Sequence, residues 1–293
     1  MTSSALGPCL AATITTDRVD TCVEAWCKYL HHTIASEQAL SPGQAEQWGR
    51  PALAGSRTVW LKNAAGEAWL RFIQDDTAAP VEPFRHTGWL SLEVNVQDVE
   101  ALHQNLLDSP FKIVGPPATL DVSADISAMQ VVGPAGEVLY LTEIKKVVPG
   151  FDLPLARSVV DRLFIPVLLV SDRDAALATY QQFPNTEGNC FATRITVLNR
   201  AHELAVDTRH PVATIQLSGS NLIEVDEFPG LMPAPIANCG LPTGISMISF
   251  AVAGGCLTGD LLDTYTSPEE PFTGRRARLL QGSGGELIEI IER

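Results

Sequence analysis

The sequence predicts an α+β fold made of four repeated units, because one local pattern closes four segments of the chain. In that pattern a glycine turn is followed by a short, mostly apolar strand, and the four copies begin at Gly66, Gly136, Gly219 and Gly285. Each copy comes after a strand, a helix and one or two further strands, so each unit has the order βαβββ. Four such endings in one chain indicate an internal repeat.

The length and composition fit a globular protein of two domains. A chain of 293 residues is too long for one small core, and its 45% hydrophobic and 18% charged residues exclude a disordered protein. Pro149 and Pro154 lie in the segment that best separates the two halves. We therefore expect domains near residues 1–147 and 158–293, each containing two consecutive units.

The net charge of −14 argues against a nucleic-acid or anionic-membrane partner, because either would be repelled. No apolar run approaches the length of a membrane span, and residues 1–8 lack the features of a signal peptide. We therefore expect a cytoplasmic protein. The six cysteines show no C-x-x-C pair and no zinc spacing, so we expect them to be reduced and mostly buried. The oligomeric state is open, and a homodimer is one arrangement.

Alternation and helical periodicity place the elements of each unit. The first half of the chain is expected to contain strand 9–16, helix 18–30, strands 58–62 and 68–73, strand 88–94, helix 96–107, short extended pieces near 113 and 129–132, and strand 138–144. The second half is expected to contain strand 163–170, helix 173–181 capped by Asp172, strands 193–198, 212–217, 221–225 and 245–252, a helix near 257–265, and strands 277–281 and 287–291.

Two glutamates inside apolar strands are the strongest candidates for a site. Glu289 shares a strand face with Leu287 and Ile291, where an ionised carboxylate is costly unless it meets a cation, a metal or a donor. Glu224 has the same place in the third unit. If both face one cavity, their like charges would raise the pKa of one and leave an acid beside a base.

Three other interpretations of these glutamates stay open. Glu289 could lie on an edge strand and point at water. Both glutamates could be structural, bonded to backbone or to an arginine; the candidate arginines are Arg194, Arg275, Arg276 and Arg278. The third alternative is a weak hard-cation site, because carboxylates suit magnesium or calcium.

Two kinds of segment resemble parts of modules of the vicinal oxygen chelate superfamily. The opening of a module is resembled by Val167–Asp172, followed by Ala175, Ala176, Leu177 and Tyr180. The close of a module is resembled by Gly136–Ile144 and Gly285–Ile291. That superfamily includes glyoxalase I, bleomycin-resistance proteins, fosfomycin-resistance enzymes and extradiol dioxygenases. The resemblance covers nearly the whole chain. It implies that modules pair into curved, half-open sheets, like half-barrels, that wrap a ligand and usually a divalent metal.

The resemblance also implies fixed places for metal ligands: a histidine or glutamine in the first strand of a module and a glutamate in the last. The last-strand places fall on Leu70, Tyr140, Glu224 and Glu289, and the first-strand places fall near Leu10, Trp89, Ile165 and Met247. None of the first-strand residues binds a hard metal through its side chain. The usual divalent metal site is therefore expected to be incomplete, and the cofactor is unknown; if a metal binds, Glu224 and Glu289 would hold it.

Two classes of function follow from this resemblance. In the first, the protein is an enzyme for a small hydrophobic or aromatic molecule, with Glu224 and Glu289 as acid–base groups of lyase or isomerase type. In the second, it binds or sequesters such a molecule without turnover, as bleomycin-resistance proteins do. The substrate-binding residues would be Trp89, Tyr140, Ile165 and Met247, unless these side chains plug the space. A ring-cleaving dioxygenase is a further alternative if a histidine completes a metal site; the candidates are His86, His202 and His210.

Overall fold

The four expected units are present in the computed structural model, which describes residues 4–121, 123–149, 152–255, 257 and 264–293. The first unit contains β1 (Leu6–Thr16), α1 (Val19–Tyr29), β2 (Thr33–Ala39), α2 (Pro42–Gln47), the 3-10 turn η1 (Pro51–Leu53), β3 (Arg57–Lys62) and β4 (Ala68–Gln74). The second contains β5 (His86–Val96), α3 (Val99–Leu106), β6 (Lys112–Leu120), β7 (Ser123–Val132) and β8 (Val138–Ile144).

The second half of the chain repeats this order. The third unit contains β9 (Val160–Val170), α4 (Arg173–Gln181), β10 (Gly188–Arg194), α5 (Thr196–Ala201), β11 (Arg209–Leu217) and β12 (Asn221–Glu227). The short strand β13 (Met232–Pro233) leads to the fourth unit, with β14 (Gly244–Val252), β15 (Tyr265–Thr266), β16 (Arg276–Gln281) and β17 (Leu287–Glu292). As expected, Asp172 caps α4 by accepting a hydrogen bond from the backbone N–H of Ala175 (2.9 Å).

Two expected elements differ from the structure. The strand expected at 193–198 is wrong in its second half, because residues 196–201 form α5 and only the end of β10 is extended. The three apolar residues Ile195, Val197 and Leu198 are buried together, and a short apolar run does not distinguish a strand from one buried helical turn. The helix expected near 257–265 lies mostly outside the described residues, as does Cys256.

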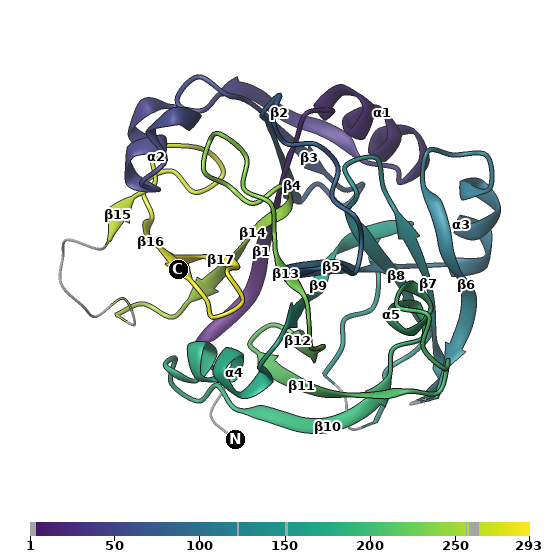
Figure 1. Ribbon diagram of the computed structural model, residues 1–293. Helices are drawn as coiled ribbons and strands as arrows, with labels where there is room; N and C mark the ends of the chain where they lie inside the picture. Colours follow the sequence, from purple (N-terminus) through teal and green to yellow (C-terminus); the bar gives the residue numbers. More distant parts are fainter. Residues whose placement is uncertain (1–3, 122, 150–151, 256, 258–263) are drawn as a thin grey trace.

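The strands form two curled sheets (Figure 1). The eight-stranded sheet has the order β15-β16-β17-β14-β1-β4-β3-β2, and the nine-stranded sheet includes the order β10-β11-β12-β9-β5-β8-β7-β6. The first unit therefore pairs with the fourth and the second with the third, which corrects the expected pairing of consecutive units. Strand patterning predicts which residues face a core, but it contains no signal for which unit lies beside which.

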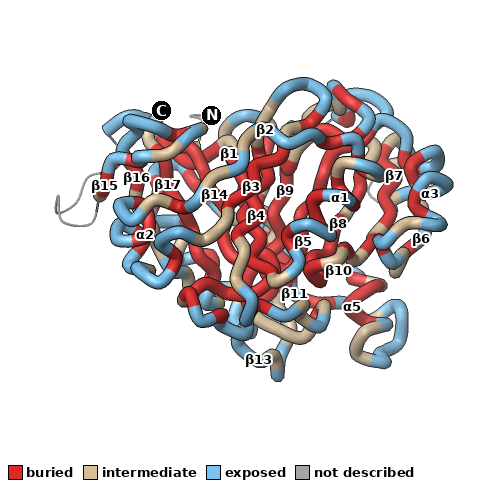
Figure 2. The backbone as a smooth tube through the Cα atoms, turned by 90° about the horizontal axis from the view of Figure 1, so that it is seen from above, coloured by how far each residue is buried: buried red, intermediate tan, exposed pale blue. Residues whose placement is uncertain are grey.

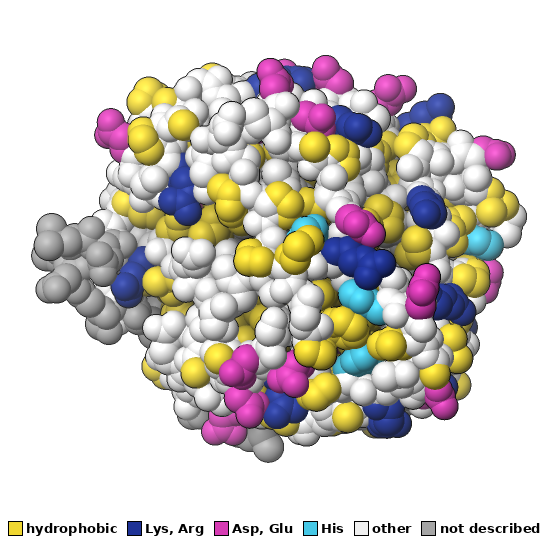
Figure 3. Space-filling model, viewed as in Figure 1, with side chains coloured by type: hydrophobic (Ala, Val, Ile, Leu, Met, Phe, Trp, Pro, Cys, Tyr) yellow, Lys and Arg dark blue, Asp and Glu magenta, His cyan; other side chains and the backbone are white. Residues whose placement is uncertain are grey.

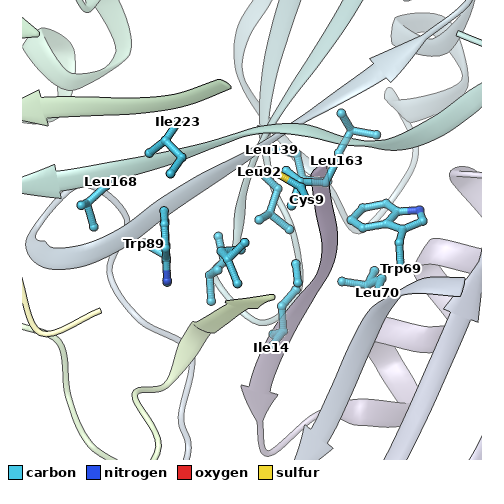
Figure 4. Packing of buried hydrophobic residues seen from close by; sticks show 14 of the residues in the cluster. Cys9, Ile14, Trp69, Leu70, Trp89, Leu92, Leu139, Leu163, Leu168 and Ile223 are labelled. Atoms are coloured by element: carbon cyan, nitrogen blue, oxygen red, sulfur yellow. The ribbon is translucent and has the colours of Figure 1, made fainter. Parts of the chain in front are cut away.

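One face of each sheet packs against the other sheet and against α1, α3 and α4, in a large shared core. Figure 4 shows part of this core, which contains Ile14 and Leu70 of the eight-stranded sheet and Leu92 and Leu168 of the nine-stranded sheet. The central strands of both sheets are buried along most of their length (Figure 2). Burial of this apolar surface is the main driving force for holding the two sheets together.

Hydrogen bonds across the shared core join one sheet to the helices of the other. The indole N–H of Trp26 on α1 donates to Glu137 (3.1 Å), and the hydroxyl of Tyr180 on α4 donates to Glu286 (3.2 Å). Both glutamates follow the glycine of a closing turn, so in the second and fourth units this turn accepts a hydrogen bond from a helix that packs in the shared core. Burial raises the pKa of Glu137 to about 7 and also raises the pKa of Glu286.

The opposite face of each sheet is concave and holds a second set of buried side chains. We call the concave face of the eight-stranded sheet the eight-stranded cup; α2 and the segments beside it cover this face (Figure 1). We call the concave face of the nine-stranded sheet the nine-stranded cup; α5 covers part of it. The viewed surface carries acidic and basic side chains interspersed with hydrophobic ones (Figure 3). In the described part of the chain, none of the helices is long and apolar enough to span a membrane.

Candidate functional site

A buried ion pair occupies the middle of the eight-stranded cup. The guanidinium of Arg71 on β4 lies 3.7 Å from a carboxylate oxygen of Glu289 on β17, and both side chains are at most 5% exposed. Arg71 also donates to the hydroxyl of Thr13 on β1 (2.9 Å) and approaches the sulfur of Met247 on β14 (3.9 Å). Residues from all four central strands of the cup thus converge on one guanidinium.

Neutral hydrogen-bond donors and aromatic rings surround this ion pair. Glu289 accepts hydrogen bonds from Ser249 (2.6 Å), Tyr265 (2.7 Å) and the indole of Trp48 (3.2 Å). The guanidinium carbon of Arg71 lies 4.6 Å from the ring centre of Trp48 and 4.9 Å from that of Trp60. Burial lowers the pKa of Arg71, and the Glu289 carboxylate opposes that shift. The charges of Arg71 and Glu289 therefore both have partners.

Glu289 meets a cation, as one interpretation of the sequence requires, and the edge-strand alternative is wrong. β17 lies between β14 and β16, and Glu289 is 2% exposed. Its ion-pair partner is Arg71, which the sequence analysis did not include among the candidate arginines.

A β-bulge explains why Arg71 was missed. Counting four residues from the turn glycine gives Leu70, but the register of β3 and β4 shifts between Leu61 and Lys62, which pair with Leu70 and Ala68. The extra residue, Trp69, moves Leu70 to the shared core and turns Arg71 into the cup. Leu70 is therefore not in the last-strand place of the first unit.

The nine-stranded cup holds a cluster of carboxyl groups instead of an ion pair. Glu93 on β5, Glu224 on β12 and Asp226 on β12 lie near one another and near Tyr140 on β8, since each carboxyl affects the pKa of that phenol. Thr142 donates to Glu93 (2.6 Å). Among the described residues, none of the three carboxyl groups forms an ion pair with Lys, Arg or His.

Burial and mutual repulsion shift the protonation of this cluster. Burial and the nearby Glu224 raise the pKa of Glu93 to about 8, although the bond from Thr142 opposes the shift. Burial raises the pKa of Glu224, and burial together with Glu224 raises that of Asp226 well above its usual range. Repulsion between neighbouring carboxylates favours a state in which at least one of them carries a proton.

Several polar atoms in the nine-stranded cup have no hydrogen-bond partner among the described residues. These are both carboxyl oxygens of Asp226, the hydroxyl of Tyr140 and the hydroxyl of Ser91. Asp226 and Ser91 are fully buried. Ser91 pairs in register with Val138 and Val167, which both face the cup, so its hydroxyl belongs to the same concave face.

The two cups differ in access. In the eight-stranded cup Thr13, Arg71, Met247 and Glu289 are all buried, whereas in the nine-stranded cup Tyr140 and Glu224 keep part of their surface exposed. Partly exposed apolar side chains, including Val132 and Leu222, also face the nine-stranded cup. The nine-stranded cup is thus the one with partly exposed polar residues, although the hydroxyl of Tyr140 is itself buried.

The predicted site residues do not come together in one place. Glu224 and Glu289 lie in different sheets and cannot hold one metal or form one acid–base pair, because the units pair differently from the order of the chain. Tyr140 and Ile165 face the nine-stranded cup, and Met247 lies in the eight-stranded cup. Trp89 lies in the shared core and donates to the carbonyl of Leu287 (2.8 Å), so its expected place in a cup is wrong.

Each candidate histidine lies within hydrogen-bonding distance of a protein oxygen. His202 lies 2.7 Å from the carbonyl oxygen of Phe84, His210 lies 2.5 Å from the side-chain oxygen of Asn199, and His86 lies 3.2 Å from the carbonyl oxygen of Pro233. Within the described ranges, no group of three His, Cys, Asp or Glu side chains is arranged to hold a metal ion. The residues of the eight-stranded cup do not fit a metal either, because the guanidinium of Arg71 takes the central place.

The repeated βαβββ units in two curled sheets also occur in solved structures of other proteins. The chain is similar to glyoxalase I from Zea mays, with a TM-score of 0.62, 11% identity and coverage of 97% of this chain and 92% of that one. It is also similar to a candidate dioxygenase from Bacillus subtilis, with a TM-score of 0.59, 12% identity and coverage of 100% and 86%. These similarities confirm the expected fold. No family model and no curated protein matches the sequence.

Proposed function

We propose that the protein acts on a small organic molecule in the nine-stranded cup, with Glu93, Glu224 and Asp226 as its acid–base groups. The observation that carries this proposal is a cluster of three carboxyl groups, one of them partly exposed, in which no cation among the described residues balances the charge. Near neutral pH such a cluster holds protonated and ionised members side by side. One member can then accept a proton from a substrate while another donates one.

Each group has a distinct role in this proposal. Glu224 is the base, because it is the most accessible of the three carboxyl groups. Glu93, with its pKa near 8, is mostly protonated at neutral pH and serves as the acid. Tyr140 offers a hydroxyl without a protein partner for a substrate oxygen. The arrangement suits proton abstraction from carbon next to a carbonyl group.

The test is isotope exchange, which detects proton abstraction before any product is known. The protein is incubated in D2O with hydroxyacetone or phenylacetone, and deuterium incorporation next to the carbonyl is followed by NMR. We expect exchange above buffer that Glu224→Gln reduces at least about tenfold. Glu187→Gln, at an exposed position far along the chain from the cluster, is the matched control and should exchange like the wild type. Absence of exchange, or equal loss in both variants, would refute the proposal.

Binding without turnover is the second candidate, and the partly exposed apolar wall of the cup favours it. In this case the protein sequesters its ligand, as the name bleomycin-resistance protein implies for relatives of this fold. Saturable ligand binding without any isotope exchange would support this candidate over the enzyme.

A further inference from the structure

The two cups are built on the same strand register, so their positions can be compared one by one. In the eight-stranded cup Thr13 pairs with Arg71 on one side and with Met247 on the other. In the nine-stranded cup Glu93 pairs with Tyr140 on one side and with Ile165 on the other. Arg71 and Tyr140 are therefore equivalent positions.

Both cups have a glutamate at the same position in the strand register. Glu289 pairs with Ser249, two residues beyond Met247, and Glu224 pairs with Val167, two residues beyond Ile165. Each cup thus presents a glutamate across from the Arg71 or Tyr140 position. In the eight-stranded cup a guanidinium lies against that glutamate, between two indole rings.

Among the described residues, the nine-stranded cup has more carboxyl groups than the eight-stranded cup and no arginine or lysine paired with them. Tyr140 replaces the arginine, Glu93 replaces Thr13, and Asp226 adds a third carboxyl group. The fully buried Ser91 hydroxyl faces the same concave side without a partner, as does the Tyr140 hydroxyl. The Ser91 hydroxyl is not part of the acidic cluster, so its lack of a partner among the described residues is a separate indication that a ligand supplies a hydrogen bond here.

We infer that the nine-stranded cup binds an organic cation, a primary ammonium or guanidinium group on an apolar stem, at the place that Arg71 fills in the other cup. This inference names the ligand class for the proposed functional site and rests on that site being the cup in use. The carboxylates accept from the cationic N–H groups, and Val132 and Leu222 contact the stem. An organic cation suits the site better than a metal ion, because no set of described ligands converges as a metal requires.

The binding experiment uses benzylammonium and benzylguanidinium, with benzyl alcohol as the neutral probe of similar shape. Isothermal titration calorimetry on the full chain at pH 7.5 should show saturable binding of both cations and at least about tenfold weaker binding of the alcohol. Binding should release protons, because a nearby cation favours the ionised carboxylates. Titrations in buffers of different ionisation enthalpy measure that release. Equal binding of the alcohol and the cations would overturn the inference, as would absence of binding.

A pair of substitutions tests the equivalence of the two cups. Tyr140→Arg should place a guanidinium against Glu224 and weaken benzylammonium binding at least about tenfold, because the cation is then internal. Tyr140→Met removes the hydroxyl without adding a charge, so it should cost the ligand one hydrogen bond, about fivefold in affinity, and weaken binding less than Tyr140→Arg does. Near-UV circular dichroism checks that both variants fold. If Tyr140→Arg binds the cation as well as Tyr140→Met does, the ligand does not occupy the Arg71-equivalent place.

The outcomes separate this inference from the proposed function. Isotope exchange with ketones and no cation binding would leave the acid–base proposal standing and overturn the ligand class. Cation binding without exchange would support the ligand class and make the protein a binder. Binding of magnesium or manganese that displaces benzylammonium would overturn the organic-cation assignment in favour of a metal.

Discussion

Replacement of Arg71 by methionine should destabilise the protein by about 3 kcal/mol. Methionine keeps most of the apolar stem and removes the guanidinium, so the buried Glu289 loses its cation while staying 2% exposed. Breaking one partner of a buried ion pair typically costs about 3–5 kcal/mol, because the remaining charge is uncompensated. Three neutral donors still reach Glu289, which places the expected cost at the lower end of that range.

The assay is urea unfolding of the wild type, Arg71→Met, Glu289→Gln and the double variant. Because the two side chains interact, the double variant should lose less stability than the sum of the single variants, with a coupling of about 1–3 kcal/mol. Additive losses would refute the reasoning, as would a cost of less than about 1 kcal/mol for Arg71→Met. The apolar stem of Arg71 would then account for all of its contribution to the free energy of unfolding.

Two further predictions concern other buried acids. Because the folded-state pKa of Glu93 is about 8, stability should fall as pH rises from about 4.5 to 8, and Glu93→Gln should flatten that decline in thermal melts. An unchanged pH slope would contradict this. Trp26→Phe and Tyr180→Phe each remove the donor to a buried turn glutamate, Glu137 or Glu286, and should each lower the free energy of unfolding by about 1–3 kcal/mol in urea titrations. No loss in either variant would show that these bonds do not join the sheets.

The fold was largely predictable because the glycine-turn ending is a local signal. Strand 138–144 and helix 173–181 begin and end in the structure at the expected residues, and the four units follow the expected order. The pairing of units was not predictable, since hydrogen bonding between β1 and β14 depends on surfaces distant in the sequence. The free cysteines were expected to be mostly buried, and Cys190 is exposed, because it lies on the outermost strand β10.

The candidate site was predicted in part, and the misses have local causes. Glu224, Tyr140 and Ile165 face the nine-stranded cup, but bulges moved Arg71 into one cup and Trp89 out of the other. Glu93 was missed although it carries the signal that identified Glu289, a carboxylate inside an apolar strand. A bulge changes the face of the sheet on which the following side chains lie, and the amino-acid sequence gives no clear signal of its position.

The pairing of the first unit with the fourth has a consequence for how the protein reaches its native state. The nine-stranded sheet takes its long strands from one continuous stretch, residues 86–227, so it can be completed while the chain is still being synthesised. β1 must wait for β14 and β17, and such non-local contacts slow folding. During that interval one side of β1 is an unpaired strand edge, open to association with other chains. The first unit to be made is thus the one completed last.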